Sequence, residues 1–236
     1  MYEERTYRGW VEPEGLVPCR VSFRESELCV YAREDVTSRV TELVCQARLA
    51  LEGYIERDAG FGSSLAPREV MADAPSLAKE MTRAASAFGV GPMAAVAGAV
   101  AQHVGKEVDG EVIVENGGDI YARVARPLTV TLHAGEGSPF GSRVRFTVDP
   151  KGEPIGICTS SGTLGHSHSF GRADAVCVIA HDAALADAAA TALCNEVRGP
   201  DDVDPVVQGA KGLRGIRGII VAAGDKLGAW GEIEFV

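Results

Sequence analysis

Hydrophobic and polar residues alternate in two short segments near the start of the chain, 17–23 and 27–32. Only the polar stretch Arg24-Glu25-Ser26 separates them. Alternation with a period of two is typical of strands that bury one face. The pattern therefore predicts a β-hairpin.

The next segment, 36–57, changes to a helical spacing of apolar residues. These residues are Val40, Leu43, Val44, Ala47, Leu51 and Ile55. They lie three or four positions apart, which places them on one face of a helix. We expect a long amphipathic helix here, followed by a loop rich in glycine and serine at 58–67.

No charged residue occurs between Arg83 and Lys106, a stretch that could be mistaken for a membrane span. Its apolar residues are mostly alanine, whereas a span needs about 20 strongly apolar residues. Four residues weaken or break helices: Gly89, Gly91, Pro92 and Gly98. The sequence predicts a buried pair of helices, one over about 75–88 and a second that opens with Pro92.

The second half of the chain is dominated by strand-like apolar runs. Strands are expected at 112–114, 120–124, 128–133, 144–148, 155–158, 175–179, 218–222 and 232–236. An alanine-rich helix is predicted at 183–197, with Asp182 as its N-cap, and a shorter helix at 203–212. This order predicts a mixed α+β fold in a single domain, 1–236.

Composition and charge exclude several classes of partner. The chain has 236 residues, a formal net charge of −10 and a pI near 5.0. Such a protein is poorly suited to neutralise the phosphates of nucleic acid or the surface of an acidic membrane. The six cysteines are scattered among apolar neighbours, so we expect reduced core residues. The first residues are charged and lack the apolar core of a signal peptide, which predicts a cytoplasmic location.

Two clusters of small polar residues are candidates for binding a phosphorylated ligand. The first contains Asn116, Gly117, Gly118 and Asp119, and the second contains Ser160, Ser161, Gly162 and Thr163. Glycine lets the backbone come close to a ligand, and successive free N–H groups can bind an anion. Each cluster also has a simpler interpretation: a tight turn in which Asp119 bonds the local backbone, and a turn rich in hydroxyl groups.

A third cluster lies within the alanine-rich helix. Asp187 and Thr191 are i and i+4 neighbours, about 5–6 Å apart at Cβ, and could hold one ion between them. Mg²⁺ accepts one or two carboxylate or other oxygen ligands and is completed by waters and phosphates. The alternative is a polar stripe that faces water.

His166 and His168 are candidate catalytic or phosphate-binding residues. In an extended segment both imidazoles would point to one side. A zinc site requires at least three protein ligands, and no third histidine or cysteine has suitable spacing. A serine hydrolase is disfavoured because Gly-x-Ser-x-Gly is absent. A structural role for both histidines remains open.

The order of these motifs resembles the ApbE family, the FAD:protein FMN transferases formerly called thiamine-biosynthesis lipoproteins. The resemblance begins with Asn116-x-Gly-Asp119 and continues through Ser161-Gly162 and a histidine loop to Asp187-Ala-Ala-Ala-Thr191. The segments 61–65, 90–98 and 114–119 are still more similar to an uncharacterised family of the same superfamily. This resemblance implies mostly antiparallel sheets with packed helices, including the Ala/Gly-rich pair.

The resemblance also implies a ligand and its residues. Asp187, Thr191 and a backbone carbonyl near positions 91–94 would bind Mg²⁺, and the polar clusters would line a cleft for FAD or FMN. The chain departs from the family in two places: Pro92-Met93-Ala94 replaces a lysine–glycine–tyrosine step, and the histidine loop lacks Asp-Pro. The family's secretory leader is also missing.

Two functions follow from this comparison. The first is a Mg²⁺-dependent enzyme that transfers or hydrolyses the FMN part of FAD. The second is a protein that binds a flavin or another phosphorylated metabolite without turnover. A cleft for an unrelated small metabolite stays open as well, and a homodimer is plausible.

Overall fold

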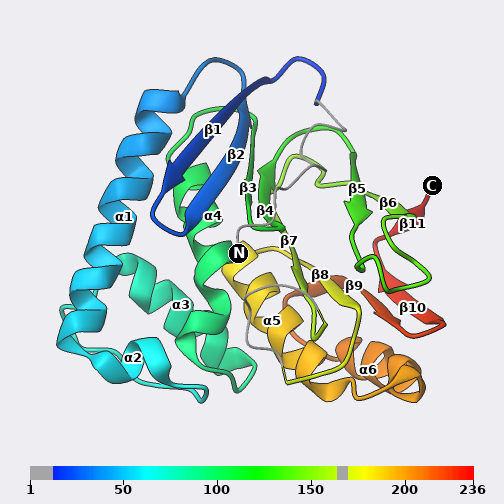
Figure 1. The fold of residues 1–236 in the computed structure, drawn as a ribbon. Coiled ribbons are helices and arrows are strands. Elements are labelled where there is room, and N and C mark those ends of the chain that lie inside the picture. Colours follow the sequence, from blue (N-terminus) through cyan, green and yellow to red (C-terminus); the bar gives the residue numbers. More distant parts are fainter. Residues whose placement is uncertain (1–12, 164–169) are drawn as a thin grey trace.

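A computed structural model describes residues 13–163 and 170–236 (Figure 1). Its helices are α1 (Thr37–Arg57), α2 (Ala59–Ser63), α3 (Ser76–Ala87), η2 (Pro92–Ala95), α4 (Val96–Lys106), α5 (Ala183–Glu196), η3 (Pro200–Asp202) and α6 (Val203–Ala210). Its strands are β1 (Val17–Phe23), β2 (Ser26–Ala32), β3 (Val112–Asn116), β4 (Asp119–Arg123), β5 (Leu128–Leu132), β6 (Val144–Val148), β7 (Ile155–Ser160), β8 (Ala175–Ala180), β9 (Ile216–Ala223), β10 (Lys226–Gly231) and β11 (Glu234–Phe235).

The strands form two sheets. The larger has eight strands in the order β1-β2-β3-β4-β7-β8-β9-β10, and the smaller has three in the order β11-β6-β5. Every strand pair among the described residues is antiparallel. The expected α+β fold with mostly antiparallel sheets and packed helices is confirmed.

The large sheet separates two hydrophobic clusters. Successive side chains of a strand point to opposite faces, so β8 contributes Val176 and Val178 to the helix-covered cluster. Its neighbours Cys177 and Ile179 belong to the cluster shared with β5 and β6. Helices and the small sheet therefore lie on opposite sides of the large sheet, as Figure 1 shows.

Most predicted elements are confirmed to within a few residues, with two clear differences. The expected loop at 58–67 contains the short helix α2, because Phe61 packs edge-on against Tyr54 in the core, with ring centroids 5.1 Å apart. The expected last strand, 232–236, is reduced to β11, and an unpredicted strand, β10, precedes it. Strand β10 is mostly exposed and lacks a buried apolar pattern, so its pairing with β9 defines it.

The predicted Ala/Gly-rich helices pack closely against their neighbours. A methyl group at Gly98 of α4 would lie 2.3 Å from the carbonyl oxygen of Ala183 at the start of α5. No single described helix is long and apolar enough to cross a membrane, although α3 and the η2–α4 segment together reach that length and composition across a bend of 101°. Both helices bury residues in the core.

Candidate functional site

Asp187 lies on the second turn of α5 and reaches the first turn of α4. Its Oδ2 accepts a hydrogen bond of 2.9 Å from the backbone N–H of Gly98, and the N–H of Ala97 also donates to this carboxylate. These amides are among the first N–H groups of α4, which have no partner inside that helix. Asp187 is only 8% exposed, so the interpretation of this residue as part of a water-facing stripe is wrong.

Strands β3 and β4 place two more predicted residues, Asn116 and Asp119, opposite each other on the same side of the large sheet. The Asn116 side chain donates to the carbonyl oxygen of Ala97 at 3.1 Å. Asp119 Oδ1 accepts the backbone N–H of Thr159 at 3.2 Å. Asn116 and Asp119 both have less than a tenth of their surface exposed.

Ser160 connects the sheet to α5. Its hydroxyl lies 3.1 Å from the hydroxyl of Thr191, one helical turn beyond Asp187. Ser160 is the last residue of β7 and is buried, rather than part of a loop as the sequence suggested. We call this set the α4–α5 junction: the side chains Asn116, Asp119, Ser160, Asp187 and Thr191, with the N–H groups of Ala97 and Gly98.

Two carboxylates in the junction are electrostatically unfavourable. Burial raises the pKa of Asp187 to about 7, against the lowering effect of the Gly98 and Ala97 amides. Burial, followed by the charge of Asp187, raises the pKa of Asp119 well above its usual range, and the hydrogen bond from the Thr159 amide only partly offsets this. A cation near both groups would favour their charged forms.

The donor chemistry of the junction fits Mg²⁺. Asp187 and Thr191 offer a carboxylate and a hydroxyl oxygen, the hard ligands that this ion prefers. Within residues 13–163 and 170–236, no three His, Cys, Asp or Glu side chains gather as a ready metal site. An ion at the junction would therefore need backbone, water or phosphate oxygens to complete its shell.

The Gly117-Gly118 turn is a tight hairpin turn. Both glycines have positive φ, 73° and 101°, and Asn116 pairs with Asp119 across the turn. Positive φ at both central positions, as in a type I′ hairpin turn, is a conformation that glycine adopts readily. The N–H of Gly118 donates to Glu115 Oε1 at 2.7 Å, so this amide already has an acceptor within the protein.

The rest of the hydroxyl cluster lies beyond the end of β7 and forms its own turn. Ser161 and Thr163 bond to each other through their hydroxyls at 3.2 Å. The N–H of Gly162 donates to the carbonyl oxygen of Ala173 at 3.0 Å. His166 and His168, the candidate catalytic residues, lie outside the described residues.

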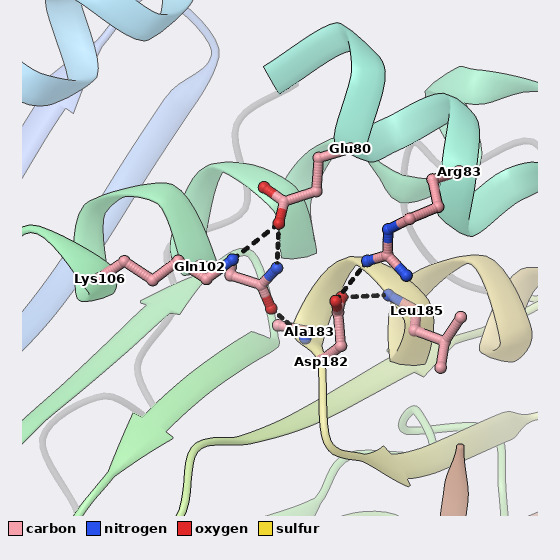
Figure 2. A network of polar contacts seen from close by, with 7 residues as sticks. All are labelled: Glu80, Arg83, Gln102, Lys106, Asp182, Ala183 and Leu185. Atoms are coloured by element: carbon pink, nitrogen blue, oxygen red, sulfur yellow. Dashed lines mark hydrogen bonds and ion pairs between the residues drawn. The ribbon is translucent and has the colours of Figure 1, made fainter. Parts of the chain in front are cut away.

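A second polar contact joins the same two helices and was missed by the sequence reasoning. Gln102 of α4 accepts the N–H of Ala183, the first residue of α5, at 2.6 Å, and donates to Glu80 at 2.5 Å (Figure 2). Each helix of the pair thus supplies a side chain to the N-terminal amides of the other. The sequence feature that could have predicted this contact is a glutamine within an otherwise mostly apolar helix. In the structure Gln102 is only 1% exposed.

A pocket of about 470 Å³ lies at the other end of β7 and β8. It is lined by Pro150, Lys151, Glu153, Pro154, His181, Arg217 and Glu232. Arg217 and Lys151 both face the carboxylate of Glu232, at 2.5 and 3.9 Å. None of the residues predicted for ligand binding lines this pocket.

The cysteines behave as the sequence predicted. All six are free, and five are buried. Cys158 lies beside the junction: its thiol donates to the carbonyl oxygen of Ala183 at 3.3 Å. Burial, and then the nearby carboxylates of Asp119 and Asp187, raise the pKa of this thiol well above its usual value. It is therefore a protonated core residue.

Known proteins resemble this chain in sequence over most of its length. The family described as AbpE bacteria matches residues 8–211. The UPF0280 protein of Methanopyrus kandleri is 43% identical over 81% of this chain and 78% of its own length. That of Methanosarcina barkeri is 37% identical over 93% and 89%.

Solved structures resemble the chain in fold. The apo form of the flavinyl transferase ApbE from Pseudomonas stutzeri gives a TM-score of 0.55 at 16% identity, covering 92% of this chain and 94% of that one. A mutant of the flavin transferase ApbE from Vibrio cholerae gives 0.56 at 13% identity, covering 92% and 97%. The chain therefore has the fold of these transferases, and it belongs to the UPF0280 family and to the ApbE-like family described as AbpE bacteria.

Proposed function

We propose that the α4–α5 junction binds Mg²⁺ together with a flavin nucleotide, and that the protein transfers or hydrolyses the FMN part of FAD. The observation that carries this proposal is the pair of buried carboxylates, Asp119 and Asp187. Burial raises the pKa of both groups, so it disfavours their charged forms relative to the protonated ones. A bound cation would remove that penalty, and the phosphates of a nucleotide would complete its ligands.

The neighbouring residues support the same assignment. Asp187 and Thr191 would hold the ion, with Thr191 oriented by its bond to Ser160. Asn116 and the α4 amides fix the position of Asp187 and of the helix end. Bound there, Mg²⁺ would neutralise charge on the phosphoanhydride as its P–O bond breaks.

The choice of a flavin rests on the sequence resemblance and on the names of the fold neighbours. Two solved structures with this fold are those of a flavinyl transferase and a flavin transferase. In the proposed reaction AMP leaves, and the FMN phosphoryl group passes to water or to an acceptor hydroxyl.

Incubation of the purified protein with FAD, with Mg²⁺ or with EDTA, tests this proposal. We expect AMP to appear only with Mg²⁺, together with FMN or a flavin-modified protein detected by mass spectrometry. Asp187→Asn is the matched control, because its amide oxygen can still accept the α4 amides while the charge is lost. If AMP forms equally in EDTA, or with Asp187→Asn, the proposed role of the junction is wrong.

Binding without turnover is the second candidate. The departures from the transferase pattern at Pro92-Met93-Ala94 and in the histidine loop favour it. It predicts Mg²⁺-dependent binding of FAD, seen as a rise in melting temperature, with no AMP. Absence of both AMP and stabilisation would contradict both candidates.

A further inference from the structure

Phe170 leaves a large aromatic ring in solvent beside the C-terminal end of α5. Its side chain is 70% exposed, the largest fraction among the exposed large hydrophobic residues that the structure describes. A single exposed hydrophobic residue is common on protein surfaces. The contacts of its backbone distinguish this one.

The main chain at Phe170 is held against the last turn of α5. The N–H of Phe170 donates to Asn195 Oδ1 at 2.7 Å. At the next residue, Gly171, a methyl group would lie 1.7 Å from the carbonyl oxygen of Cys194, so the two backbones are in direct contact. The N–H of Arg172 then donates to the carbonyl oxygen of Val197 at 2.7 Å. The backbone is fixed at three successive residues, whereas the ring is left uncovered.

Phe170 is connected to the junction through one face of α5. Asp187, Thr191 and Asn195 follow each other at intervals of four residues and therefore lie along the same face. Each bonds to a different segment: Gly98 of α4, Ser160 of β7 and Phe170. At a rise of 1.5 Å per residue, Asp187 and Asn195 are about 12 Å apart along the helix. A nucleotide that is bound through its phosphates at Asp187 can bring its ring system to the other end of this stripe.

An exposed aromatic ring on a fixed backbone is a good surface for stacking. Aromatic side chains stack with flat heterocycles, and they lose little conformational entropy when they do so. We propose that Phe170 is the residue on which the planar ring of the bound nucleotide stacks. This inference rests on the proposed function of the junction and adds the residue that selects a ligand with a flat ring.

Titration of ligands with and without a ring, all in the presence of Mg²⁺, tests the inference. FMN, ADP and inorganic pyrophosphate are titrated into the wild-type protein, Phe170→Ala and Phe170→Trp. Phe235→Ala is the matched control, because Phe235 is another exposed phenylalanine, on β11 in the small sheet.

We expect Phe170→Ala to weaken binding of FMN or ADP by roughly 5- to 150-fold, the range that stacking on an aromatic side chain provides. Whichever of the two nucleotides loses affinity carries the stacked ring. Pyrophosphate affinity should stay unchanged. Phe170→Trp should retain the affinity, and it should quench flavin fluorescence if FMN is the stacked ligand. Phe235→Ala should bind all three ligands as the wild type does.

Two results separate failure of this inference from failure of the proposed function. If Phe170→Ala binds both nucleotides as tightly as the wild type, the ring serves another purpose and the inference is wrong, while the junction proposal stands. If the wild-type protein binds none of the three ligands with Mg²⁺, the junction proposal fails and the inference fails with it.

Discussion

Two polar contacts join α4 and α5, and each supplies a hydrogen-bond acceptor to backbone amides at the N-terminus of one helix. The two acceptors differ in chemistry. Gln102 of α4 binds the first amide of α5, and Asp187 of α5 binds the first amides of α4. The glutamine is neutral and also bonds Glu80, whose carboxylate is paired with the partly exposed Lys106 (Figure 2). The aspartate is an ionisable group whose pKa is raised by burial, and it lies near a second buried carboxyl group, that of Asp119.

This difference indicates which contact serves only the fold. A neutral amide satisfies a helix end without burying a charge, whereas a buried carboxylate without a countercharge is costly. A protein that needed Asp187 only as a cap for α4 would be more stable with asparagine there. The aspartate therefore fits a ligand that supplies positive charge, which is the basis of the Mg²⁺ proposal.

The largest expected effect is on the pH dependence of stability. The pKa of Asp187 is raised from 3.8 to about 7 in the folded protein, so between these values the folded state holds a proton that the unfolded state releases. Without Mg²⁺, the free energy of unfolding should fall as pH rises from about 4 to 7, by up to about 1.4 kcal/mol per pH unit. Urea denaturation at several pH values measures this slope. Asp187→Asn should remove Asp187's share of it, and an equal slope in that variant would show that other groups are responsible.

Gly98→Ala should destabilise the helix pair by about 1–3 kcal/mol. The added methyl group would lie 2.3 Å from the Ala183 carbonyl oxygen and 2.8 Å from the Asp187 Cβ, so the helices must separate. Gly53→Ala in α1 is the matched control, because its methyl group meets nothing within 4 Å. That control should gain about 0.5–1 kcal/mol. Equal effects of the two substitutions in urea denaturation would contradict the close packing.

Gln102→Leu should cost about 1–3 kcal/mol, because the N–H of Ala183 loses its acceptor in a buried position. Mg²⁺-dependent ligand binding should be retained, since Gln102 contributes only to the fold. Gln46→Leu on the exposed face of α1 serves as control and should change stability by less than about 0.5 kcal/mol. A Gln102→Leu protein that is fully stable but fails to bind ligand would reverse the proposed division of roles.

Thr191→Val should have the smallest effect on stability, about 0.5–1.5 kcal/mol, because it removes only the bond to Ser160 and keeps the shape of the side chain. A double-mutant cycle with Ser160→Ala measures the coupling of the two hydroxyls. Ligand binding should nevertheless weaken if Thr191 holds the ion. Unchanged Mg²⁺-dependent binding would remove Thr191 from the site.

Periodicity predicted the elements that bury a continuous apolar face. Helix α1 and strand β1 show this most clearly, because each buries residues at its own period. Strand β2 is instead buried almost throughout, as the second strand of the large sheet. Strand β10 was missed since it buries no regular face and depends on pairing with β9. Helix α2 was missed because one buried aromatic residue, Phe61, determines it.

The site was predicted less completely, because some of its contacts depend on tertiary packing rather than on residue type. The spacing of Asp187 and Thr191 correctly placed both on one face of a helix, and the carboxylate of Asp119 was recognised as a candidate. The partners of Asp187 could not be predicted, because they are backbone amides of another helix and leave no trace in residue type. Only Gly98 hinted at them, as a glycine where a methyl group would collide with Asp187.

Calorimetric titration of FAD into the wild-type protein and into Asp187→Asn, each with Mg²⁺ and with EDTA, tests the central claim most directly. We expect the wild-type protein to bind FAD tightly only with Mg²⁺. Asp187→Asn should lose at least about tenfold in affinity, a loss of 1.4 kcal/mol or more, while its melting temperature is no lower than that of the wild type. Equal binding by the two proteins, or equal binding with and without Mg²⁺, would show that the carboxylate of Asp187 serves the fold alone.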